Sequence, residues 1–249
     1  MKRIIFTFLF YNGYFILSRN FRRQNIGNHI WLFKNYNLRK ICFGLDELMI
    51  LNISNSTVYD AEFLKIIEQV SETCFLPLTV GGRINSLNDA DKYFKVGADK
   101  IFINDLIFKN PDACHELIKT YGSQAVMGGI NISFSQNKYS VFESDGFTKH
   151  CKKFNDHLEY ILDLNIGEVL IQSIDNDGTG VGLDLSILDL IPDNFSLPII
   201  LMGGVGKKQH IIDALSNNKV DAISTANILN FIGSSLLTVR QSAINAGVN

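Results

Sequence analysis

Proline and cysteine are both scarce in this sequence of 249 residues, with four of each. With so few prolines and no low-complexity tract, no segment looks like an interdomain linker. We therefore expect one domain over residues 1–249, with the fold spanning about residues 2–246. The cysteines form no CxxC pair and no Cys/His spacing suited to a metal, so we expect reduced, mostly buried thiols and no metal or cofactor. They are Cys42, Cys74, Cys114 and Cys151.

A large charge of one sign and long apolar runs are also absent. Lys and Arg total 23 and Asp and Glu total 25, so the net charge is −2 and nothing favours nucleic-acid binding. The segment 4–10 is apolar but far shorter than the ~20 residues that span a bilayer, and no cleavage site for a signal peptide follows it. A buried first strand is the better interpretation, and we expect a cytoplasmic protein without a membrane span.

Short apolar runs alternate with helix-length amphipathic stretches along the whole chain. Such an alternation predicts an α/β fold of eight strand–helix units, a single closed (β/α)8 TIM barrel. Asn110 is expected to cap the helix that Pro111 begins. The expected strands are 3–10, 47–53, 78–80, 100–103, 125–130, 168–174, 199–202 and 222–225, and the expected helices include 60–71, 87–95, 111–121, 155–164, 209–216 and 234–246.

The two halves of the chain resemble each other. Segment 46–51 matches 167–172, segment 76–82 matches 197–204, and Ala98-Asp99 matches Val220-Asp221. The repeat is about half the chain in length, whereas solenoid repeats have periods of about 20–50 residues. We therefore expect a barrel built from two fused half-barrels of four units each.

Two kinds of loop follow the predicted strands at the face where TIM barrels carry their active sites. The pairs Gly81-Gly82 and Gly203-Gly204 follow the third and seventh strands, where glycine lets backbone N–H groups approach an anion such as a phosphate. Tight turns explain these pairs about equally well. Asp175 and Asp177 lie beyond the sixth strand, although Asp-Gly is also an ordinary turn sequence.

Together these motifs resemble HisF, the cyclase subunit of imidazole glycerol phosphate synthase. The resemblance covers nearly the whole chain in order, and its most specific part is the run from Ser173 to Thr179. It implies that a partner glutaminase releases ammonia, which crosses the barrel interior and reacts with a ribulosyl nucleotide at the C-terminal face. The other matching segments are 3–5, 78–82, 97–100, 103–104, 122–124, 167–168 and 203–204.

The catalytic positions depart from the HisF pattern. Leu9 and Asn131 stand where the family has its general acid and base aspartates, at the ends of strands one and five, and Leu17 replaces a basic residue in the loop after strand one. Neither leucine nor asparagine titrates near neutral pH, and losing one acid–base group typically costs about 10²–10⁴-fold in rate. No catalytic residue is intact, so classical cyclase chemistry is not expected.

The resemblance implies that the two phosphate sites of the family persist only as remnants. Gly82 and Asn104 remain, but Arg83 replaces a third glycine, and Asp105 replaces a neutral threonine and would repel phosphate. Across the barrel, the matched substrate-site positions are Asp177, Gly204, Ala226 and Asn227, with Asn227 and Met202 in place of serines.

The opposite end of the barrel keeps the family's pattern. The resemblance identifies Arg3, Glu47, Lys100 and Glu168 as the ring of charges that closes the entrance to the ammonia passage. A salt-bridged plug that only caps the barrel is the alternative, but buried ion pairs are poor stabilisers compared with apolar packing. Asp99, on the surrounding face, is the expected contact for the glutaminase.

Within the family, the chain is most similar to the HisF-like glycosyl amidation-associated proteins found with surface-polysaccharide genes, which share a leucine at the position of Leu9. That resemblance implies a barrel that receives ammonia from a HisH-like glutaminase and passes it to an amidotransferase acting on a sugar. Two alternatives stay open. One is an active cyclase that uses residues such as Asp175 or Asp177, and the other is a scaffold that only binds the glutaminase.

Overall fold

The computed structural model describes residues 2–35, 38, 43–226, 241, 244 and 245. Its centre is a closed barrel of eight parallel strands, because β1 pairs with both β4 and β11 and each other barrel strand pairs with its two neighbours. The strands in order around the barrel are β1 (Arg3–Tyr11), β4 (Glu47–Asn52), β5 (Leu78–Gly81), β6 (Lys100–Ile103), β7 (Val126–Ser135), β9 (Glu168–Ser173), β10 (Ile199–Met202) and β11 (Ala222–Thr225). The predicted TIM barrel is confirmed.

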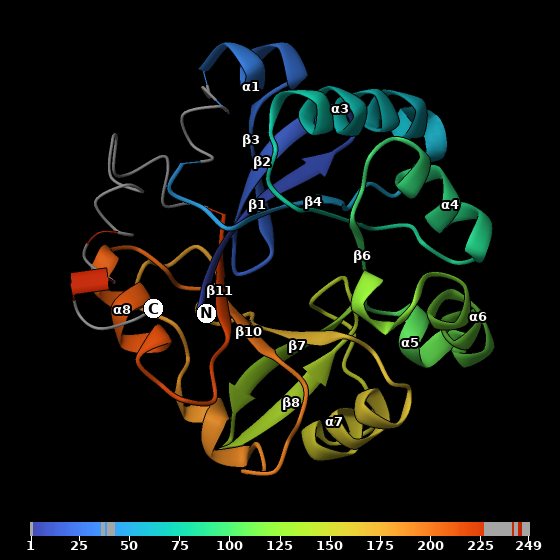
Figure 1. The fold of residues 1–249 in the computed structure, drawn as a ribbon. Coiled ribbons are helices and arrows are strands. Elements are labelled where there is room, and N and C mark those ends of the chain that lie inside the picture. Colours follow the sequence, from blue (N-terminus) through green and yellow to red (C-terminus); the bar gives the residue numbers. More distant parts are fainter. Residues whose placement is uncertain (1, 36–37, 39–42, 227–240, 242–243, 246–249) are drawn as a thin grey trace.

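Helices surround this barrel (Figure 1). Asn110 caps α6 as predicted, because its side chain accepts a hydrogen bond from the Ala113 N–H at 3.2 Å. Ser86 caps α4 in the same way, because its side chain accepts a hydrogen bond from the N–H of Asp89. The helices are α1 (His29–Asn35), α3 (Asp60–Thr73), α4 (Leu87–Lys95), α5 (Leu106–Lys109), α6 (Pro111–Tyr121), α7 (Phe154–Asp163) and α8 (Lys208–Leu215), with short 3₁₀ helices η1 (Thr57–Tyr59), η2 (Ser123–Ala125) and η3 (Ser186–Leu190).

The barrel strands are buried on both faces. A large apolar core fills the space between the sheet and the helices, and a second, smaller apolar cluster fills the barrel interior. Continuous burial explains why these strands show apolar runs rather than a clean polar alternation, as is usual for parallel sheets. The interior cluster comprises Ile5, Leu9, Ile16, Met49, Leu51, Met127, Leu170, Ile200, Met202 and Ala222.

Several connections differ from the expected strand–helix pattern. The segment after β1 was expected to be a loop, but it forms an antiparallel hairpin of β2 (Tyr14–Arg19) and β3 (Arg22–Gly27), and β7 continues into a hairpin with β8 (Lys138–Phe142). The chain after β9 forms η3, a short 3₁₀ helix rather than an α-helix. The predicted helix 234–246 and the substrate-site position Asn227 lie outside the described residues, apart from 241, 244 and 245.

The cysteine prediction is wrong in one respect. Cys74 is disulfide-bonded, so the thiols are not all reduced. Cys151 is exposed, whereas Cys74 and Cys114 are buried. Cys114 is a buried free thiol as expected, and burial raises its pKa to about 12. No helix among the described residues is long and apolar enough to cross a membrane.

Candidate functional site

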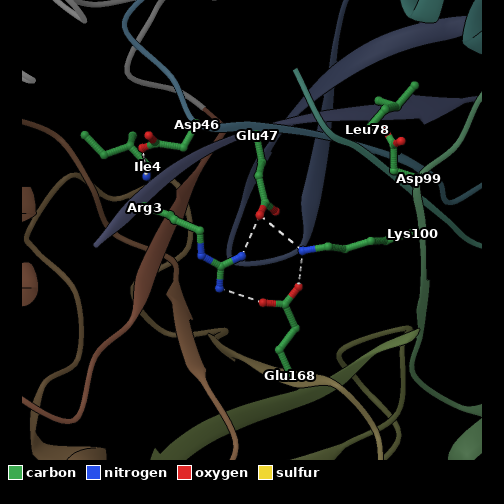
Figure 2. A network of polar contacts seen from close by, with 8 residues as sticks. All are labelled: Arg3, Ile4, Asp46, Glu47, Leu78, Asp99, Lys100 and Glu168. Carbon is green, nitrogen blue, oxygen red and sulfur yellow. Dashed lines mark hydrogen bonds and ion pairs between the residues drawn. The ribbon is translucent and has the colours of Figure 1, made fainter. Parts of the chain in front are cut away.

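The four charged residues singled out at the strand starts form a closed ring, hereafter the charge ring (Figure 2). Arg3 bridges two carboxylates, with Nη1 2.5 Å from Glu47 Oε1 and Nη2 2.6 Å from Glu168 Oε2. Lys100 bridges the same two, with Nζ 3.1 Å from Glu47 Oε1 and 2.7 Å from Glu168 Oε1. Two cations and two anions therefore alternate at the N-terminal end of the barrel, and each cation contacts both anions.

Burial and charge act against each other in this ring. Glu47 and Glu168 are only 4% and 5% exposed. Burial alone would raise the pKa of Glu168, but hydrogen bonds and Coulomb attraction from Arg3 and Lys100 outweigh it and hold that pKa below its usual value. Burial alone would lower the pKa of Arg3, but hydrogen bonds and Coulomb attraction from Glu168 and Glu47 outweigh it. The pKa of Arg3 is therefore raised. Both shifts favour the charged forms of Arg3 and Glu168, and the formal charges of the two cations and two anions cancel.

Aspartates at the starts of alternate barrel strands hold this end of the barrel together. Asp46 accepts the N–H of Ile4 at 2.7 Å, Asp99 accepts the N–H of Leu78 at 2.8 Å, and Asp221 accepts the N–H of Ile199 at 2.9 Å. Figure 2 shows the first two of these contacts beside the ring. Asp99 thus has a structural role that sequence reasoning missed, and its role as a partner contact stays a prediction.

The contacts of Asp99 and Asp221 are equivalent under the proposed half-barrel repeat. At the position corresponding to Asp46, the other half has Gly167, where a Cβ would come within 2.4 Å of the Ser123 carbonyl oxygen. The close approach of η2 therefore excludes a side chain at that position. The repeat itself stays a prediction, which these matched contacts support.

Above the charge ring the barrel interior is mainly apolar. Its polar exceptions are Thr7 and Ser224, whose hydroxyls lie 2.6 Å apart, and Thr79, whose Oγ1 has no hydrogen-bond partner among the described residues. Phe102, two residues after Lys100 on β6, lies against the backbone of Gly129, where any side chain would collide with its ring. Phe102 therefore stands between the charge ring and the other end of the barrel.

A cavity of about 380 Å³ opens at the C-terminal end of the barrel. It brings together five of the predicted site residues from β1, the end of β5, the end of β6 and β7, namely Leu9, Gly82, Arg83, Asn104 and Asn131. The two hairpins supply part of its wall through Phe21 and Arg23 after β2 and Ser144 and Asp145 after β8. We call this the C-terminal cavity.

The two residues predicted to stand at the family's acid and base positions, Leu9 and Asn131, bring no ionisable group into this cavity. Leu9 is 7% exposed, pairs with Ile16 of the hairpin and belongs to the interior apolar cluster. Asn131 is 4% exposed, and its Nδ2 donates to the carbonyl oxygen of Glu143 at 3.0 Å. A carboxylate has no proton to donate in that bond, so the amide suits this contact and an aspartate does not.

Arg83 and Asp105 make contacts that the sequence could not reveal. Arg83 has φ 59°, and its guanidinium reaches Ser54 O at 3.1 Å and Asp60 Oδ1 at 3.3 Å. Asp105 accepts the N–H and the hydroxyl of Ser144, each at 2.8 Å, and pairs with Lys109 at 3.0 Å. The charge expected to repel phosphate is therefore balanced, and it anchors the segment after β8.

The predicted substrate-site residues on the opposite side that the structure describes do not line the C-terminal cavity. Asp177 is 5% exposed and binds the first hairpin through the Ser18 hydroxyl at 2.5 Å and the Phe21 N–H at 3.1 Å, while its burial raises its pKa. The carbonyl oxygen of Gly204 accepts the N–H of Gly182 at 2.8 Å, and Ala226 packs against the interior cluster. This half of the expected site is covered by the chain's own loops.

Sequence reasoning missed several polar residues of the cavity, among them Asn52 and Gln172. Asn52 at the end of β4 is 2% exposed, its Oδ1 accepts the Ser54 N–H at 3.0 Å, and its Nδ2 has no partner among the described residues. The hairpins were also missed, although Asn12-Gly13 is a strong hairpin signal after an apolar strand. Within the described part of the chain, no group of three or more His, Cys, Asp or Glu side chains is arranged to hold a metal.

The closed (β/α)8 architecture is that of a TIM barrel, and its cavity lies at the C-terminal end, where enzymes of this fold carry their active sites. The family model described as histidine biosynthesis protein matches residues 20–233. A protein from Parasynechococcus marenigrum, provisionally named imidazole glycerol phosphate synthase subunit hisF2, is 36% identical to this chain. The match covers 97% of this chain and 90% of that protein.

Two further relatives carry the name imidazole glycerol phosphate synthase subunit HisF. The protein from an Exiguobacterium species is 35% identical over 83% of this chain and 78% of its own length. The protein from Chlorobium limicola is 34% identical over 82% of this chain and 81% of its own length. The chain belongs to the HisF family of histidine biosynthesis proteins.

Proposed function

We propose that this chain is the ammonia-conducting subunit of a glutamine-dependent amidotransferase complex that modifies a sugar of a surface polysaccharide. The observation that carries the proposal is a contrast between the two ends of one barrel. The charge ring is complete, whereas the C-terminal cavity lacks both ionisable groups of the family's chemistry. A protein that kept the entrance and lost the acid–base pair suits transfer of ammonia better than cyclisation.

One atom of the ring favours a gate over a structural plug. Glu47 Oε2 is buried and has no hydrogen-bond partner among the described residues. A group buried without a partner costs about 1–3 kcal/mol, so a plug selected only for stability would be expected to satisfy it. An ammonia molecule that enters at the ring has N–H donors for this oxygen.

The interior beyond the ring suits a small neutral solute. Ammonia stays uncharged among apolar side chains, because transfer of an ammonium ion into such surroundings carries a large desolvation cost. Thr79 pairs in register with Lys100 on the neighbouring strand, and its unpartnered hydroxyl offers a second polar contact just beyond the ring. Phe102 then has to move for the solute to reach the C-terminal cavity.

The relatives named as synthase subunits support a partner at the N-terminal face, which we take to be a HisH-like glutaminase. Phe43 and Phe75 are 80% and 94% exposed and lie in the segments that lead into β4 and β5, at the end where the ring opens. Exposed aromatic side chains of this kind commonly anchor protein interfaces. Asp99, also exposed, would then set the register of docking more than its affinity.

Rewired cyclase chemistry through Asp175 or Asp177 has less support. Asp175 accepts the Ser133 hydroxyl at 2.9 Å and the Phe134 N–H at 2.6 Å, and Asp177 is buried against the first hairpin. Neither residue lines the C-terminal cavity. Their carboxylates hold loops, so the acceptor chemistry in our proposal belongs to a separate sugar amidotransferase.

The experiment reconstitutes the chain with a HisH-type glutaminase and the acceptor amidotransferase from the same genome. Glutamine hydrolysis and ammonia incorporation are both measured, for the wild type, for Lys100→Ala and for the control Lys119→Ala on an exposed helix end. We expect Lys100→Ala alone to change the ratio of the two rates. An unchanged ratio with intact binding would make the chain a scaffold, and no binding of the glutaminase would refute the proposal.

A further inference from the structure

Every charged side chain that lines the C-terminal cavity already has a partner. The Arg23 guanidinium lies 4.2 Å from the centre of the Tyr11 ring, and Arg83 binds Asp60 and the Ser54 carbonyl. Asp105 is held by Ser144 and Lys109, as described above. The cavity therefore offers little free charge to a ligand.

The fourth charged residue of the lining, Asp145, is engaged in the same way. Its carboxylate accepts the N–H groups of Phe147 and Thr148 at 2.7 and 2.8 Å and the Thr148 hydroxyl at 2.6 Å. Burial would raise the pKa of Asp145, but these bonds outweigh it and the pKa is lowered. An anionic ligand would thus meet the carboxylates of Asp105 and Asp145 in the wall, beside two cations that already contact Asp60 and the Tyr11 ring.

Carboxamides remain as the uncommitted polar groups. Asn52 Nδ2 is buried without a partner, and the side chains of Asn104 and Gln172 make no hydrogen bond within the described part of the chain. Asn52 ends β4, Asn104 follows β6 directly and Gln172 is the next-to-last residue of β9, so the three approach the cavity from different sides of the barrel. A carboxamide both donates and accepts, as a hydroxyl does, and the two pair without charge.

Apolar and aromatic side chains form much of the remaining wall, with Phe21 from the hairpin, Phe102 from β6 and Leu51 from β4, beside polar residues such as Ser54 and Asn55. A volume of about 380 Å³ falls at the lower end of the about 300–1,000 Å³ found for small-molecule sites. Apolar walls with a few convergent polar groups are the usual composition of such sites. A sugar ring has C–H faces for the aromatic side chains and hydroxyls for the carboxamides.

We propose that the C-terminal cavity binds an uncharged, polyhydroxylated ligand of monosaccharide size through Asn52, Asn104 and Gln172. The binding itself is independent of ammonia transfer. If the proposed function holds, the ligand stands at the end of the barrel where ammonia emerges. It would then be the acceptor sugar or the part of it that enters the barrel.

The test is saturation-transfer NMR on the full chain with glucose, N-acetylglucosamine, N-acetylgalactosamine and ribose as neutral probes, and with inorganic phosphate and ribose 5-phosphate as anionic competitors. Asn52→Asp keeps the acceptor for the Ser54 N–H and removes the free donor. Asn165→Asp makes the same chemical change at an exposed turn and serves as the control. Gln172→Leu is a second cavity variant, in case Asn52→Asp does not fold.

We expect at least one neutral probe to bind, its affinity to fall at least tenfold in Asn52→Asp or Gln172→Leu, and no change in Asn165→Asp. Competition by ribose 5-phosphate stronger than by ribose would overturn the assignment of a neutral ligand. Absence of binding by all four neutral probes would overturn the site itself. Ammonia transfer is measured in a separate experiment. A failure of sugar binding would therefore leave the proposed function standing, and a failure of ammonia transfer would leave the binding site standing.

Discussion

Replacing Lys100 by alanine removes the cation that lies between the two buried carboxylates of the charge ring. Its Nζ lies 2.7 Å from Glu168 and 3.1 Å from Glu47, whose side chains are 7% and 6% exposed. Breaking a fully buried ion pair costs about 3–5 kcal/mol, because one charge stays behind without compensation. Lys100 is about one-fifth exposed and Arg3 still bridges both carboxylates, so we expect a loss of about 2–3 kcal/mol.

The chain offers a matched control in Lys109. Its Nζ also bridges two carboxylates, those of Asp105 and Glu143 at 3.0 and 2.6 Å, but the side chain is 57% exposed. Exposed ion pairs contribute about 0–1 kcal/mol, so Lys109→Ala is expected to cost less than about 1 kcal/mol. The comparison separates the effect of burial from the number of contacts.

The assay is urea unfolding followed by circular dichroism, with the slope compared among variants to check that the unfolded state is unchanged. Lys100→Met keeps much of the apolar stem and isolates the loss of the charge. The double variant Lys100→Met/Glu168→Gln lacks one charge of each sign, so it should regain part of the free energy of unfolding that Lys100→Met loses. Equal costs for Lys100→Ala and Lys109→Ala would show that the ring is not the desolvated network described here.

Three further predictions follow from the same contacts. The pKa of Glu168 is lower in the folded protein than its ordinary value of 4.5. Its contribution to stability should therefore be complete above pH 4.5 and be lost as the pH falls through the folded pKa, which urea unfolding at a series of acidic pH values will measure. Asn131→Asp should cost about 1–3 kcal/mol and speed amide exchange around Glu143, because the donor to that carbonyl is lost; unchanged exchange contradicts the contact. With ammonium supplied directly, the wild type and Leu9→Asp/Asn131→Asp should not convert the ribulosyl nucleotide; turnover by the wild type within about tenfold of an ordinary cyclase contradicts this.

The barrel strands could be predicted because each is a short, continuously apolar run bounded by turn residues. β6, β10 and β11 have the predicted bounds, and the start of β4 and of β9 is marked by a glutamate that turned out to belong to the ring. The family resemblance supplied the ring itself. Whether the four side chains form a closed ring depends on the distances between their charged atoms, which only the structure provides.

The hairpins could not be predicted from hydrophobic patterning. β3 reads Arg-Arg-Gln-Asn-Ile-Gly and is mostly exposed, so it has no apolar face to mark it as a strand. The roles of Asp105 and Asp177 depend on partners 39 and 159 residues away in the sequence. An acidic residue in a loop looks the same whether it meets a substrate or holds another loop, and only the fold distinguishes the two.

The most direct test of ammonia conduction is an isotope competition in the reconstituted complex of this chain, the glutaminase and the acceptor enzyme. Glutamine labelled with ¹⁵N in the side-chain amide is supplied together with an excess of unlabelled ammonium in the buffer. Passage through the barrel predicts that the product carries the ¹⁵N fraction of the glutamine, and that Lys100→Ala shifts the label toward the buffer. A wild-type product with the isotope composition of the buffer would contradict conduction through the barrel.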